Sequence, residues 1–158
     1  MFRHRTFLFV ILVLVTITTL PAQTSPSANE IMAAISMYKD EALGLSSVKI
    51  WDKYQSVTEL QKILYGNKPF GPGAFSKENL QALGYLDALR LRKDMKEPEG
   101  TYYYSMYQLS FWDTLSQIPG NENTANKLMN EILDWLKFAA DEKYTSAMYS
   151  LEIGRAHV

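Results

Sequence analysis

The sequence predicts an all-α protein made of stacked antiparallel helix pairs, an α-solenoid-like arrangement. Apolar residues recur at helical spacing in successive segments, which are separated by glycine, proline and capping residues. No stretch of any length shows the alternation that is typical of a strand. The 158 residues are 47% hydrophobic and 13% aromatic, which suffices to bury one core.

The N-terminus has the layout of a secretory signal peptide, predicted over residues 1–23. Two arginines precede an apolar run from Phe7 to Leu20, and cleavage is expected after Ala22 or Gln23. A membrane-spanning helix needs about 20 apolar residues, so an uncleaved anchor is the less favoured alternative. We therefore expect export to the periplasm or the cell exterior, with membrane contact only through this transient segment.

The last seven residues, 152–158, resemble the translation of a common sequencing adapter, and a genuine polar tail is the alternative. We exclude them from the fold prediction, as one excludes a cloning scar. The helical array is accordingly expected to be truncated at its C-terminal side.

The remaining segment, 24–151, offers little chemistry for catalysis. It contains neither histidine nor cysteine, since His4 and His157 both lie in the excluded ends. Removing Arg3, Arg5 and Arg155 leaves 13 of 16 cationic residues, and removing Glu152 leaves 16 of 17 acidic ones, a net charge of −3. Histidine- or cysteine-dependent nucleophiles and ordinary zinc sites are excluded, and a nucleic-acid partner, which needs a basic face, is not expected. No metal or cofactor is predicted.

The region 24–98 is predicted to hold three helices. The first begins with a capping box, Ser27 to Glu30, ends at Gly44 and buries Ile31, Ile35, Tyr38 and Ala42. The second is expected over 47–65, with an apolar side formed by Trp51, Tyr54, Val57, Ile63 and Leu64. After a Gly/Pro-rich loop at 66–73, Ser76 is predicted to cap a third helix that runs through Leu80, Leu83, Leu86 and Leu89 and ends before Pro98. Its basic last turn, with Arg90, Arg92, Lys93 and Lys96, is interpreted as complementing the helix dipole.

The region 99–151 is predicted to hold three more helices. The fourth, about 101–117, is apolar nearly all round and should be sandwiched between neighbours. The fifth should begin at a cap formed by Asn123 or Thr124 and bury Leu128, Ile132, Trp135, Leu136 and Ala139. A sixth helix is expected from about Thr145.

An internal repeat relates the fourth and sixth helices. Residues 105–109 match residues 147–151 at a spacing of 42 residues, and Tyr102 matches Tyr144. Residues 128–151 resemble the Sel-one-like repeat, a relative of the tetratricopeptide repeat, and the matching residues are Trp135, Ala139, Ala140, Ala147 and Leu151. The small residues would let two helices approach closely, while Trp135, Tyr149 and Leu151 fill the space between successive pairs.

The sequence departs from the family pattern in two places. Lys143 occupies the position of the family's turn glycine, and Lys93, Glu97 and Pro98 replace the tryptophan and the two alanines of the upstream copy. The resemblance is therefore specific over about 128–151, weak over 99–127 and nearly absent over 24–98.

The resemblance implies a protein–protein interaction scaffold in the cell envelope or outside the cell, with a protein or peptide partner. Exposed members of one aromatic cluster are the candidate binding residues, because interfaces favour tyrosine and tryptophan. The cluster consists of Tyr102, Tyr103, Tyr104, Tyr107 and Trp112. The competing interpretation is that each of these residues fills the core.

Two other functions stay open from the sequence. An enzyme would have to use carboxylates, but Glu131, Asp134, Asp87 and Asp94 are interpreted as surface acids of amphipathic helices, which leaves a non-catalytic part of a longer envelope enzyme as the alternative. The other alternative is that residues 24–98 form a small ligand-binding helical domain with the loop 66–73 as a lid, an interpretation that rests on that loop and on Phe70 and Phe75.

Overall fold

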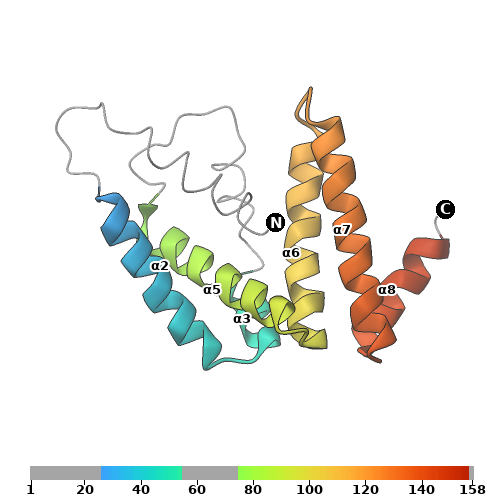
Figure 1. Cartoon of the computed structure of the whole chain (residues 1–158), viewed down its shortest axis with the longest axis horizontal. Helices are drawn as coiled ribbons and strands as arrows, with labels where there is room; N and C mark the ends of the chain where they lie inside the picture. Colours follow the sequence, from blue (N-terminus) through green and yellow to red (C-terminus); the bar gives the residue numbers. More distant parts are fainter. Residues whose placement is uncertain (1–25, 55–74, 157–158) are drawn as a thin grey trace.

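The computed structural model describes residues 26–54 and 75–156, and within these ranges the chain is helical, without a strand (Figure 1). The all-α prediction is thus confirmed. The predicted signal peptide, the second helix beyond Tyr54 and the loop 66–73 lie outside the described residues. The described helices are α2 (Ala28–Leu43), α3 (Ser47–Tyr54), α5 (Lys77–Asp94), α6 (Pro98–Ser116), α7 (Glu122–Asp141) and α8 (Thr145–Ala156).

Each long helix packs against the next one described along the chain. Helix α2 packs on α5, α5 on α6, α6 on α7 and α7 on α8, while the short α3 packs against α5 and α6. Figure 1 shows α6 and α7 side by side and antiparallel, with α8 leaving from the lower end of α7. Helix α6 is covered by α3, α5 and α7, which confirms that this largely apolar segment is sandwiched.

The N-terminal helix has the predicted boundaries. The Glu30 backbone N–H donates to Ser27 Oγ at 3.3 Å and the Ser27 N–H donates to Glu30 Oε2 at 2.7 Å, which completes the capping box. All four residues predicted to be buried are buried: Ile31, Ile35, Tyr38 and Ala42. Gly44 follows the last helical residue as predicted.

Two helix starts differ from the prediction. Helix α5 ends at Asp94, before Pro98 as predicted, but α6 begins at Pro98 rather than at about Thr101. Proline suits the first position of a helix because its missing N–H has no intrahelical acceptor there and its fixed φ is helical. Helix α7 begins at Glu122 after Asn121 rather than at a cap formed by Asn123 or Thr124. The Asn121 side chain makes no capping hydrogen bond, so the capping signal of this sequence pointed to the wrong residue.

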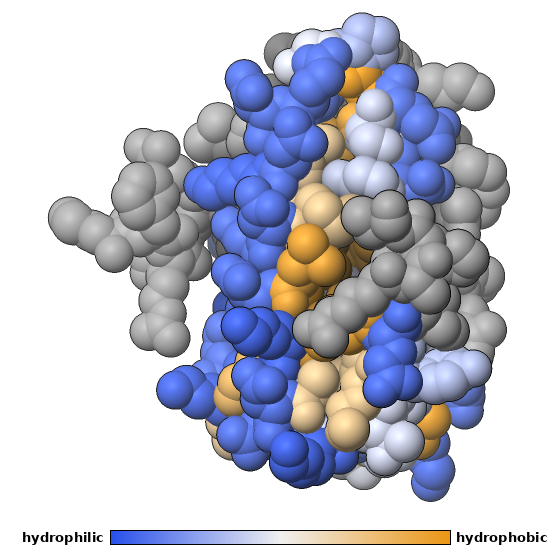
Figure 2. Space-filling model, turned by 90° about the vertical axis from the view of Figure 1, so that its right-hand side faces the viewer, coloured by the Kyte–Doolittle hydropathy of each residue, from blue (hydrophilic) through white to orange (hydrophobic). Residues whose placement is uncertain are grey.

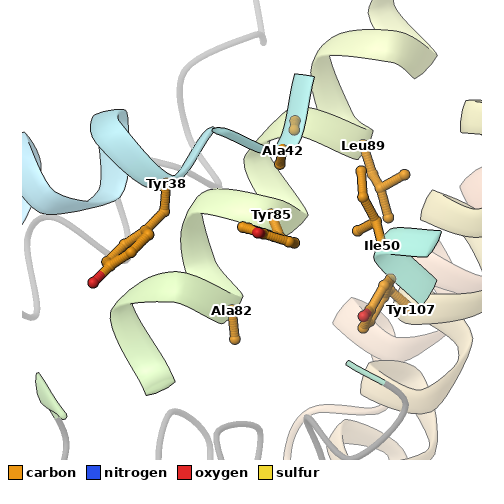
Figure 3. Packing of buried hydrophobic residues seen from close by; sticks show 8 residues of the cluster. Tyr38, Ala42, Ile50, Ala82, Tyr85, Leu89 and Tyr107 are labelled. Atoms are coloured by element: carbon orange, nitrogen blue, oxygen red, sulfur yellow. The ribbon is translucent and has the colours of Figure 1, made fainter. Parts of the chain in front are cut away.

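The core of the N-terminal part lies where α2, α3, α5 and α6 meet (Figure 3). The third helix runs through Leu80, Leu83, Leu86 and Leu89 as predicted, and of these Leu89 is fully buried while the other three are half-buried at the edge of the core. Small residues and Tyr85 complete the contact face of α5. The buried cluster comprises Tyr38, Ala42, Ile50, Ala82, Tyr85, Ala88, Leu89 and Tyr107.

The contact between α2 and α5 depends on Gly84. A Cβ atom at this position would lie 2.5 Å from Tyr38 Cβ and 2.7 Å from the Ile35 carbonyl oxygen. Because one of these neighbours is the backbone of α2, the space cannot be made by a side-chain rotation. The two helices therefore approach as closely as they do only because residue 84 lacks a side chain.

The turns α5–α6 and α7–α8 have the same construction. Lys96 and Lys143 both adopt left-handed backbone conformations, with φ of 60° and 66°. In each turn the next N–H bonds back five residues, Glu97 to the Arg92 carbonyl at 3.0 Å and Tyr144 to the Ala139 carbonyl at 3.0 Å. These are Schellman-type helix ends, which usually have glycine at the left-handed position.

Candidate interaction surface

The predicted aromatic cluster does not form one surface, because its members face different neighbours. Tyr107 is only 4% exposed and belongs to the core, so it is not an exposed member of the cluster. Tyr102, Tyr103, Tyr104 and Trp112 are half-buried. The structure brings two of these residues together with aromatic residues from other elements.

A continuous row of four rings crosses from α3 over α6 to the α7–α8 turn. The centroids of Trp51 and Tyr103 lie 5.7 Å apart, those of Tyr103 and Tyr102 5.1 Å apart, and those of Tyr102 and Tyr144 5.2 Å apart. All four side chains are half-buried. We call Trp51, Tyr103, Tyr102 and Tyr144 the aromatic row. Its spacing falls in the range in which aromatic pairs attract one another, so the rings support each other's orientation.

Within the aromatic row, Tyr103 has a raised pKa. Burial, together with a hydrogen bond between the hydroxyls of Tyr103 and Tyr144, raises the pKa of Tyr103 well above its ordinary value. Tyr103 therefore stays protonated at neutral pH.

Trp51 and Tyr144 were not among the predicted binding residues. Trp51 was interpreted as part of the apolar side of a helix, and nothing local distinguishes it from a core residue. A signal for Tyr144 did exist in the sequence, because the 42-residue repeat pairs it with Tyr102. The two repeat-related tyrosines are in direct contact.

Tyr104 lies in a joint between three helices. Its ring is 5.3 Å from the ring of Trp135 in α7, and the Lys93 ammonium of α5 lies 5.1 Å from the Tyr104 centroid and 4.7 Å from that of Trp135. Burial raises the pKa of Tyr104 above its ordinary value. A cation over two rings stabilises this joint, so the role of Tyr104 is in packing.

Trp112 sits on α6 with its indole N–H buried. Within the described residues, neither Trp112 Nε1 nor the buried Thr101 Oγ1 has a hydrogen-bond partner. A buried donor without an acceptor costs free energy, so both positions are locally destabilising. Trp112 has no place in the aromatic row.

The carboxylates predicted to be surface acids divide into two kinds. Glu131, Asp134 and Asp94 are exposed, as expected, but the prediction is wrong for Asp87, which is 8% exposed. Asp87 Oδ1 accepts from Arg90 Nε at 2.8 Å, and its Oδ2 lies 3.7 Å from Lys39 Nζ. This carboxylate is buried because two cations neutralise it, and it links α5 to α2.

Arg92, interpreted from the sequence as a cation near its own helix end, caps the end of α2 instead. Its guanidinium donates to the carbonyl oxygens of Leu43 and Leu45 and to Ser47 Oγ, the last at 2.8 Å. It is buried against Gly100, where a Cβ atom would lie 2.4 Å from Arg92 Cβ. Arg92 thus satisfies carbonyl groups left free at the end of α2.

The residues predicted to support the repeat are only partly in their expected places. Ala139 and Ala147 are fully buried and Trp135, Ala140 and Leu151 are half-buried. Tyr149 was expected to fill the space between helix pairs, but it is 65% exposed. None of the described helices covers its side chain.

No protein-family model, no curated protein and no solved structure matches this chain. Among the helices described, none combines the length and the apolar character needed to cross a membrane.

Proposed function

We propose that this protein is an exported, non-catalytic helical scaffold that binds a protein or peptide partner in the cell envelope or outside the cell. The observation that carries the proposal is the aromatic row, in which four half-buried rings from three elements adjoin one another. Tyrosine and tryptophan supply large contact areas with little loss of side-chain entropy, and they dominate the binding energy of many interfaces.

Two features support the Sel-one-like, solenoid-like arrangement as part of this proposal. The five long helices described pack in the order in which they follow along the chain, and the turns at Lys96 and Lys143 have the same construction. Lys143 stands where the repeat family has its turn glycine, and it adopts the left-handed conformation that glycine favours. The buried Ala139 and Ala147 allow the close helix approach that such a repeat needs.

Export is proposed from residues 1–23 alone. N-terminal sequencing of the protein recovered from outside the cytoplasm should give Thr24 or Gln23 as the first residue. An intact Met1 in the exported protein would contradict cleavage. The alternative of a ligand-binding domain with a lid depends on 66–73, outside the described residues, and stays a prediction.

Site-specific crosslinking tests the scaffold function. A photoreactive phenylalanine analogue placed at Tyr102 or at Tyr144 should crosslink one discrete partner in intact source cells. The matched control is the same analogue at Ser110, which is exposed on the same helix as Tyr102. The proposal fails if Tyr102 and Tyr144 give no product, or if Ser110 gives the same product with equal yield.

A pair of substitutions refines this test. Tyr102→Ala should reduce the yield of the crosslink formed from position 144 by about tenfold, and Tyr102→Phe should retain most of it, because the ring provides most of the contact. Circular dichroism of each variant establishes that the helices remain folded.

A further inference from the structure

Glu99 differs from the other charged residues that the described part of the chain withdraws from water. It is half-buried, and five further charged side chains there are buried or half-buried. These are Lys39, Asp87, Arg90, Arg92 and Lys93. Each of the five forms an ion pair. No ion pair within the described residues involves Glu99.

Most other charges of the described helices lie in water. The charged side chains of α7 are all exposed. Figure 2, which views the side on which α7 and α8 lie, shows hydrophilic residues on both sides of an apolar stripe. A hydrated charge needs no partner, whereas covering a charge costs free energy unless an opposite charge or a hydrogen bond compensates for it. The dipole at the start of α6 favours a carboxylate at position 99 and offsets part of this cost, and a cation would offset more.

Glu99 lies beside the aromatic row. It precedes Tyr102 and Tyr103 in α6 by three and four residues, a spacing that places the side chains on neighbouring turns of one helix face. Burial is the largest cause of the raised pKa of Tyr103, and the negative charge of Glu99 also contributes to it. The carboxylate is therefore within electrostatic reach of the row.

The protein holds a lysine with rings and a carboxylate at the joint of α5, α6 and α7. The Lys93 ammonium lies 5.1 Å from the ring centroid of Tyr104 and 4.7 Å from that of Trp135. The same nitrogen lies 3.0 Å from Asp94 Oδ1. The ring faces attract the cation through their quadrupoles, and the carboxylate attracts it through its charge.

A second lysine is held in the same way between α2, α3 and α5. Lys53 Nζ lies 5.0 Å from the ring centroid of Tyr85 and 4.0 Å from Glu41 Oε1. Rings, a carboxylate and a cation thus occur together twice among the described residues. The aromatic row and Glu99 supply the rings and the carboxylate of this combination, and none of the cation–ring contacts of the described helices involves the row.

We propose that the aromatic row and Glu99 bind a cationic side chain, arginine or lysine, of the protein or peptide partner. This inference rests on the proposed scaffold function and names the chemistry that the partner would bring. The cation would lie against the rings and donate hydrogen bonds to the Glu99 carboxylate. A charge-assisted hydrogen bond to a half-buried carboxylate is stronger than one to a neutral group, so Glu99 would select the charge of the ligand.

A blocked tripeptide, N-acetyl-glycyl-arginyl-glycinamide, is the probe, because a guanidinium can stack on a ring and donate to a carboxylate together. The control peptide has citrulline in place of arginine, which keeps the shape and removes the charge. NMR titration of the whole mature chain should show saturable shifts of the Glu99, Tyr102 and Tyr103 signals with the arginine peptide. The citrulline peptide should bind at least about tenfold more weakly.

Substitutions in the protein separate the local carboxylate from the net charge. Glu99→Gln should weaken binding of the arginine peptide at least about tenfold, because it removes the charge beside the rings. Asp113→Asn is the matched control, since it removes one negative charge from an exposed position of the same helix, and it should change binding by less than about twofold. Circular dichroism establishes that both variants are folded.

Two outcomes of the titration overturn the inference. Equal binding of the arginine and citrulline peptides would mean that the row does not recognise charge. Equal weakening by Glu99→Gln and Asp113→Asn would mean that only the net charge matters.

The crosslink formed from position 144 distinguishes this inference from the scaffold function. If Glu99→Gln reduces its yield about tenfold and Asp113→Asn does not, both are supported. A crosslink that Glu99→Gln leaves unchanged would contradict the cation site and leave the scaffold function standing. Binding of the arginine peptide without any crosslinked partner would contradict the scaffold function instead.

Discussion

The N-terminal helices α2, α3 and α5 and the C-terminal helices α7 and α8 are held together by different means. Between α2 and α5, buried charges and a bare backbone contact at Gly84 define the geometry, with Asp87 and Arg92 bonded across the helices. Between α7 and α8, fully buried alanines provide the contact. The N-terminal joint therefore combines directional bonds with the absence of a side chain at Gly84, whereas the C-terminal joint depends on small side chains.

This difference has a consequence for how each region responds to mutation. Hydrogen bonds to a buried guanidinium have one geometry, so removing the cation leaves several acceptors unsatisfied. Contacts between small apolar residues do not require one fixed geometry, so two helices that meet through alanines can shift slightly without leaving a polar group unsatisfied. We expect the N-terminal joint to be the more sensitive of the two.

Arg92→Ala should have the largest effect. It removes the donor for the Leu43 and Leu45 carbonyl groups and for Ser47, and the free energy of unfolding should fall by about 3 kcal/mol. Arg92→Lys should recover only a small part, because one ammonium cannot reach all three acceptors. Chemical denaturation measures the change, with the exposed Lys77→Ala as control. Equal stabilities of Arg92→Ala and Lys77→Ala would contradict the role of Arg92 as a cap.

Gly84→Ala should come next, with a loss of about 2 kcal/mol. The added methyl group would meet Tyr38 Cβ and the backbone of α2, and this overpacking outweighs the gain in helix propensity. Gly44→Ala is the matched control, since its Cβ would lie 3.4 Å from the Glu41 carbonyl oxygen, an ordinary van der Waals contact. Thermal unfolding of both variants makes the comparison. A stabilised Gly84→Ala protein would show that α2 and α5 can separate freely.

In the C-terminal region, Lys143→Gly should stabilise the protein by about 1 kcal/mol. A left-handed conformation costs a residue with a Cβ atom about this much, and glycine avoids the cost. The equivalent change at Lys96 should act in the same direction. Chemical denaturation of both variants tests whether the two turns are equivalent in energy as well as in form, and a destabilised Lys143→Gly protein would contradict the left-handed turn.

The smallest effect concerns alkaline pH. Burial, followed by the hydrogen bond that the Tyr85 hydroxyl donates to Glu41, raises the pKa of Tyr85 to about 12. Because the folded state holds this proton more tightly than the unfolded chain, the stabilisation is complete below about pH 10 and is lost as the pH rises toward about 12. Tyr85→Phe should flatten the decline of unfolding free energy over that window. An unchanged slope would assign the decline to other tyrosines.

Periodicity and capping sufficed to predict most of the helices. The burial of Ile31, Ile35, Tyr38 and Ala42 follows from one face of a periodic segment, and the sandwiched position of α6 follows from its apolar circumference. Both are local properties, which a sequence displays directly. The start of α7 was missed because several consecutive polar residues could each serve as a cap.

The structure of the joints and of the aromatic row could not be predicted in the same way. Asp87 and Arg92 are charged residues that bond to distant parts of the chain. Arg92 bonds to Ser47, 45 residues away, and Asp87 pairs with Lys39 of another helix, so their own neighbours in the sequence do not indicate that they are buried. The contact of Trp51 with Tyr103 likewise depends on where α3 comes to rest. Only Tyr144 had a signal in the sequence, through the repeat.

The position of Lys93 bears on how the protein unfolds. Its ammonium lies over the ring of Tyr104 in α6 and over that of Trp135 in α7. Because Lys93 itself belongs to α5, its side chain connects the N-terminal helices with the C-terminal ones. Unfolding of α7 would uncover Trp135 and leave the cation without one of its two rings. The two regions are thereby coupled in energy, and heating should melt them in a single cooperative transition in spite of their different packing.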